Sequence, residues 1–100
     1  MTEQELRLEA RLSAMEYMIS HTLSRIHVLT GATNEQLDAM EDDARVTLSA
    51  TTLPGADPAM ADMFAGELQE CIERLIEITR EMTDETRSKI DAWQKTNEPL

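Results

Sequence analysis

The sequence contains two histidines, the residue type that most often binds metals, but their spacing does not suit a metal site. His21 and His27 are six residues apart in a predicted helix, which places them on different faces. Neither belongs to a Glu-x-x-His or His-x-x-x-His pair, the spacings with which helices present metal ligands. We therefore expect no metal site.

Cys71 is the only cysteine, so no disulfide forms within the chain. It lies between Leu68 and Leu75 in an apolar row, with acidic neighbours, which predicts a buried and unreactive thiol. No nucleophile has a base beside it in a local motif, and the three glycines are too isolated for a phosphate loop. We expect no catalytic residue, no cofactor and no enzymatic activity.

The residues with the clearest pattern belong to a long first helix, predicted over residues 3–29. Thr2 and Glu5 form a capping box, and Gly31 suits the left-handed residue that closes a helix. Between them runs a heptad pattern with alternating spacings of four and three, typical of helices that pair. Its members are Leu8, Leu12, Met15, Ile19, Thr22, Ile26 and Leu29, and all but Thr22 are apolar.

Two further helices follow the first. Thr33 and Gln36 repeat the capping-box pattern before a shorter helix over 34–50, which ends ahead of the break at residues 53–56. Asp57 and Pro58 then predict the start of a helix over 58–95. Its apolar row changes face after Met82, so the sequence leaves open whether this helix continues past Thr83.

These signals predict an all-α chain of three helices, long, shorter and long, in a single domain over residues 1–100. We expect helices 1 and 3 to pack antiparallel. The third helix is longer than the first, so part of it extends beyond the first helix. The apolar side chains of that part need another element to pack against. A second copy is the simplest one, giving a homodimeric helical bundle. The side chains expected to be mostly buried there are Leu8, Leu12, Met15, Ile19, Ile26, Leu68, Leu75, Ile78 and Met82. The residues expected at interfaces are Leu8, Leu12, Met15, Ile19, Ile26, Met60, Met63, Ile90 and Trp93.

The chain is strongly acidic, with 20 acidic and 9 basic residues and a net charge of −11. Such a surface repels phosphate backbones and anionic lipids, so we expect neither nucleic acid nor membrane as a partner. The acidity instead allows a basic protein as a partner, besides a second copy of the chain. No signal peptide or membrane-spanning run is recognisable, which predicts a soluble, cytoplasmic protein.

The order of helices resembles that of the small all-helical chorismate mutases, which work as interlocked dimers. Arg7, Arg11 and Arg25 on the first helix are the residues that invite this comparison. The resemblance implies a site in which several cations converge on a dicarboxylate. The second helix supplies only Arg45 for that purpose, and the overall acidity opposes anion binding, so the resemblance concerns architecture alone.

The sequence thus favours a small, acidic, non-enzymatic interaction or assembly protein that acts through helix–helix self-association. One alternative is an acidic adaptor or inhibitor that covers a basic partner. A remote alternative is a small helical enzyme with a pocket lined by Arg7, Arg11, Arg25 or Arg45.

Overall fold

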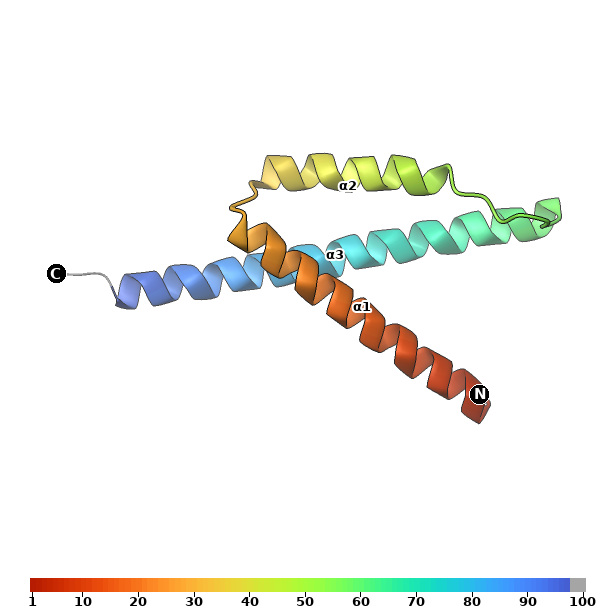
Figure 1. Ribbon diagram of the computed structural model, residues 1–100, viewed down its shortest axis with the longest axis horizontal. Coiled ribbons are helices and arrows are strands. Elements are labelled where there is room, and N and C mark those ends of the chain that lie inside the picture. The colour runs from red at the N-terminus through yellow and green to blue at the C-terminus, as the bar shows by residue number, and fades with distance from the viewer. Residues whose placement is uncertain (98–100) are drawn as a thin grey trace. The chain divides into compact units, whose positions relative to one another are not determined.

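The computed structural model describes residues 1–97, and these form three α-helices and no strand. The helices are α1 (Glu3–Leu29), α2 (Asn34–Ser49) and α3 (Pro58–Thr96), as Figure 1 shows. The prediction of an all-α chain with three helices is confirmed, and each boundary lies within one residue of the predicted one.

Local capping interactions fix where each helix begins. At the start of α1, the Glu5 amide donates to the Thr2 hydroxyl over 3.1 Å, and the Thr2 amide donates to the Glu5 carboxylate over 3.0 Å. The same reciprocal pair joins Thr33 and Gln36 ahead of α2. The Asp57 carboxylate accepts from the Met60 amide over 2.8 Å at the start of α3. Each bond satisfies an amide that has no partner within its own helix.

A local feature also marks the end of α1. Gly31 has a φ of +67°, the left-handed conformation predicted for the residue that closes α1. By contrast, α3 continues without interruption through Thr83 to Thr96. This answers the question that the sequence left open about the end of the third helix.

The chain divides into two compact units, and α3 contributes to both. One unit joins residues 1–31 to the part of α3 from Ile78 onward, and the other comprises Ala32–Glu77. The boundary lies within α3, between residues 77 and 78. Each unit is described by itself below.

In the first unit the buried side chains are small and polar. Ser20 and Ser24 of α1 and Thr79 and Thr83 of α3 are at most 8 % exposed. Side chains of this size allow two helices to approach closely. The buried hydroxyls of Ser24 and Thr83 donate to carbonyls of their own helices, those of His21 and Thr79, over 2.9 and 2.7 Å. These two hydroxyls therefore need no partner across a contact.

Helices α1 and α3 pack together in this unit, but the predicted antiparallel pairing is not confirmed. Figure 1 shows α1 crossing this part of α3 obliquely, with both segments running toward the same side of the view. A crossing of this kind gives a short contact, which suits the few small residues that are buried.

In the second unit, α2 covers one row of α3. Leu37 of α2 is the only fully buried hydrophobic side chain of the described residues. On α3 the half-buried positions include Leu68, Ile72 and Ile76, which are four residues apart and so share one side of the helix. A bidentate ion pair between Arg45 and Glu73, with contacts of 2.7 and 3.1 Å, joins the two helices.

Within the single chain, the apolar rows of the first and third helices and Cys71 are less buried than predicted. Leu8, Leu12, Met15, Ile19 and Ile26 are exposed, because α1 packs through its serines and not through its heptad pattern. Leu68, Leu75, Ile78 and Met82 are only half-buried. Cys71 is exposed, where a buried thiol was predicted. The reason is that the half-buried row at Leu68, Ile72 and Ile76 lies to one side of it.

Candidate functional site

The candidate site is an uncovered apolar stripe along α1, formed by Leu8, Leu12, Met15, Ile19 and Ile26. We call these five residues the apolar seam. Their exposed fractions lie between 47 and 58 %. Their spacings of four, three, four and seven residues keep all five on one face of the helix over about five turns. A continuous apolar face of this length on a helix is typical of a surface that another helix covers.

The seam and the buried serines lie on different faces of the same helix. At 100° per residue, the direction of the seam is more than a third of a turn, about 130°, from that of Ser20 and Ser24. Contact with α3 of the same chain therefore leaves the seam accessible. The structure thus gives α1 two usable faces, one occupied within the chain and one uncovered.

The other predicted interface residues lie on α3 and are also exposed. Met60 and Met63 stand at its start, with exposed fractions of 55 and 71 %, and Ile90 and Trp93 near its end, with 38 and 66 %. The structure assigns the first pair to the second unit and the second pair to the first unit. Ile90 and Trp93 thus share a unit with the seam, whereas Met60 and Met63 do not.

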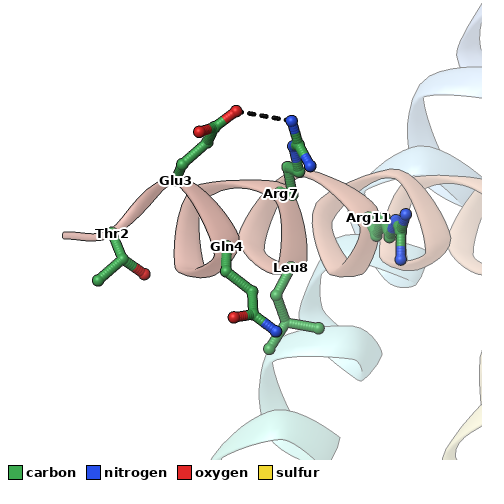
Figure 2. Close-up of a pocket in the computed structure, with 6 residues that line it drawn as sticks. All are labelled: Thr2, Glu3, Gln4, Arg7, Leu8 and Arg11. Carbon is green, nitrogen blue, oxygen red and sulfur yellow. Dashed lines mark hydrogen bonds and ion pairs between the residues drawn. The ribbon is translucent and has the colours of Figure 1, made fainter.

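A surface hollow of about 610 Å³ lies at the start of α1. Its six lining residues come from the N-cap and first turns of α1, as Figure 2 shows: Thr2, Glu3, Gln4, Arg7, Leu8 and Arg11. Arg7 is held by Glu3 in an ion pair of 2.6 Å, whereas Gln4 and Leu8 point to another side of the helix. A hollow whose lining comes from one helix suits contact with another helix better than enclosure of a small molecule.

Of the four arginines of the enzymatic alternative, three are spread along α1 and the fourth is paired with carboxylates. Arg7 and Arg11 line the hollow on α1, but Arg25 is 14 residues farther along the same helix, about 21 Å from Arg11. Arg45 is engaged by carboxylates, since it donates to Glu73 and, over 2.8 Å, to Asp42. The hydrogen bond to Glu73, with that to Asp42, raises the pKa of Arg45, and the same bond from Arg45 lowers the pKa of Glu73. Its charge is thus neutralised by protein groups.

A second hollow, of about 370 Å³, lies in the second unit between the end of α2 and α3. Leu48, Leu68 and Ile72 give it an apolar lining, and the Arg45–Glu73 pair lies at its side. Sequence reasoning missed this hollow, because it depends on which rows of two separate helices face each other. Neither Met60 nor Met63, which were expected at interfaces, lines it.

Within residues 1–97, no group of three or more His, Cys, Asp or Glu side chains is arranged to hold a metal ion. None of the helices in this range is both long and apolar enough to cross a membrane. No protein family, curated protein or solved structure matches the chain.

Proposed function

We propose that the protein is a small acidic, non-enzymatic interaction or assembly protein that acts by pairing with a second copy of itself through the apolar seam of α1. One observation carries the proposal. Leu37 is the only fully buried hydrophobic side chain in residues 1–97, whereas five large apolar side chains of α1 stand exposed at heptad spacing.

The distribution of charge supports α1 as the contact between copies. Residues 1–30 carry four acids and three bases, a net charge of −1, whereas residues 31–53 carry five acids and one base, a net charge of −4. Two copies of a chain with a net charge of −11 repel each other least where that charge is smallest. The least acidic segment is therefore also the one with the uncovered apolar face.

The energetics indicate that the seam does not act alone. Burying the remaining half of each seam side chain gains roughly 1 kcal/mol, about 10 kcal/mol for the ten side chains of two copies. The cost of association is about 4–15 kcal/mol, so this gain leaves little surplus. We therefore expect Ile90 and Trp93, which share a unit with the seam, to add apolar area to the interface.

The experiment is the molar mass in solution, measured by light scattering after size exclusion over a hundredfold dilution. We expect a dimer that Leu12→Glu converts to monomer, because each copy would bury a carboxylate in the seam. Leu6→Glu is the matched control, since Leu6 is an exposed leucine of the same helix outside the seam. A monomer at every concentration would overturn the proposal and leave the basic-partner alternative.

A further inference from the structure

The charges beside the apolar seam distinguish between the two orientations in which a pair of α1 helices can associate. Leu12, Ile19 and Ile26 are seven residues apart and form one row of the seam, and Leu8 and Met15 form the other. β-branched residues in the first row with leucine in the second favour two-stranded parallel coiled coils. The apolar residues thus suit a two-stranded pair, and the flanking charges distinguish its orientation.

Arg11 and Arg25 flank this first row, each one residue before a seam position, and Glu16 flanks the second row. In a parallel in-register pair, a residue that directly precedes the first row, as Arg11 does, lies beside the residue five positions later in the other copy. Arg11 then lies beside Glu16 of the second copy, and the twofold symmetry repeats this attraction.

An antiparallel pair with the same overlap places Leu8 opposite Ile26 of the second copy. In that arrangement Arg11 lies opposite Arg25 of the second copy, and Glu16 lies opposite its own equivalent. Arg11, Arg25 and Glu16 then all face like charges, which is unfavourable. The same sequence therefore gives two attractions in one orientation and three repulsions in the other.

The surroundings of these side chains leave the two arginines available. Arg11 and Arg25 are exposed, and neither has an ion pair within residues 1–97. Arg11 lies beside Leu8 in the hollow of Figure 2, next to the seam. Glu16 is half-buried and already interacts within its own chain. A carboxylate nevertheless accepts from several donors at once, so it also suits an arginine of the second copy.

We propose that two copies associate through α1 in parallel and in register, with Arg11 of each copy beside Glu16 of the other. This inference rests on the proposed self-association and adds its orientation. It also assigns to Arg11 and Arg25 a role in specificity, since together they oppose the antiparallel pair.

Charge reversal at Arg11 tests the orientation, because the two arrangements predict changes of opposite sign. In a parallel pair, the glutamate of Arg11→Glu lies beside Glu16 of the other copy, and the twofold symmetry gives two such repulsive contacts. We therefore expect the dissociation constant of the dimer to rise by about tenfold. The double variant Arg11→Glu/Glu16→Arg should recover most of that loss. In an antiparallel pair, Arg11→Glu would instead face Arg25 and tighten the dimer. Arg7→Glu is the matched control, an exposed arginine one turn away from the flanking position.

Disulfide formation gives a second and independent measurement. With Cys71 replaced by serine, Leu8→Cys should cross-link to itself in a parallel pair, where the two residues meet. In an antiparallel pair these residues are about 27 Å apart, too far for a disulfide. A cross-link between Leu8→Cys and Ile26→Cys chains, without self-cross-linking of Leu8→Cys, would overturn the parallel orientation but leave the dimer. A monomer by light scattering would overturn the dimer itself.

Discussion

At the scale of single residues, the arginines of this protein differ in what they contact. Arg45 is held by Glu73 and Asp42 and fixes α2 to α3 within one unit. Arg11 and Arg25 have no ion pair among the described residues and stand beside the apolar seam. A guanidinium already engaged by two carboxylates is a poor anion site, whereas an unengaged one is available to another chain. This contrast gives Arg45 a structural role and leaves Arg11 available for the recognition role proposed above.

The Arg45–Glu73 pair predicts a pH dependence of stability. Because Arg45 lowers the pKa of Glu73, the pair stabilises the fold above the ordinary carboxyl pKa of about 4.3 and loses this effect as the pH falls through the lowered value. Glu73→Gln should therefore lower the melting temperature at neutral pH, and the difference from the parent chain should vanish in acid. Thermal unfolding followed by circular dichroism measures both.

Glu70→Gln is the control for that comparison, since it makes the same change of charge at an exposed position one turn away on α3. It should change the melting temperature less than Glu73→Gln at neutral pH. Equal effects of the two variants at every pH would show that net charge, and not the ion pair, is responsible.

At the scale of helices, the boundaries could be predicted because they depend on a few neighbouring residues. Thr2, Thr33 and Asp57 each bond an amide three residues ahead, so the sequence alone identifies these starts. Burial could not be predicted in the same way, since it depends on which faces meet. The contact of the first unit buries Ser20 and Thr83, which a hydrophobic pattern counts as polar. Small residues four apart were the available signal.

The candidate site was predictable to a similar extent. The heptad spacing of the seam was evident from the sequence, and the structure leaves that face of α1 uncovered. The hollow beside Arg45 was not evident, because Leu48 and Leu68 come from different helices and are 20 residues apart. Patterns within one helix are thus informative here, whereas contacts between helices require the structure.

The capping box of α2 gives a prediction at this scale. Thr33→Ala removes the hydroxyl that accepts from the Gln36 amide and should destabilise the fold by about 1 kcal/mol. For a domain of this size, that change lowers the melting temperature by about 4–8 °C. Thr47→Ala, at an exposed position inside the same helix, should be neutral or stabilising because alanine is the better helix former. Equal losses for the two variants would contradict the capping role.

At the scale of the whole molecule, the described residues fully bury little apolar surface, while the side chains of the seam stand exposed. Among the described residues, Leu37 alone is a buried hydrophobic side chain, and the other four buried side chains carry hydroxyl groups. Burial of apolar surface is the main favourable contribution to folding. If a second copy supplies the missing burial, the stability of the fold depends on association.

This dependence gives a prediction that needs no variant. When folding is linked to dimer formation, each tenfold increase in protein concentration stabilises the folded dimer by about 1.4 kcal/mol. The melting temperature should then rise by a few degrees per decade of concentration. Circular dichroism at several path lengths measures it over a hundredfold range, with Leu12→Glu as the control that abolishes the slope. A melting temperature that is high and does not change with protein concentration would contradict this prediction. It would mean that each chain is stable without a second copy.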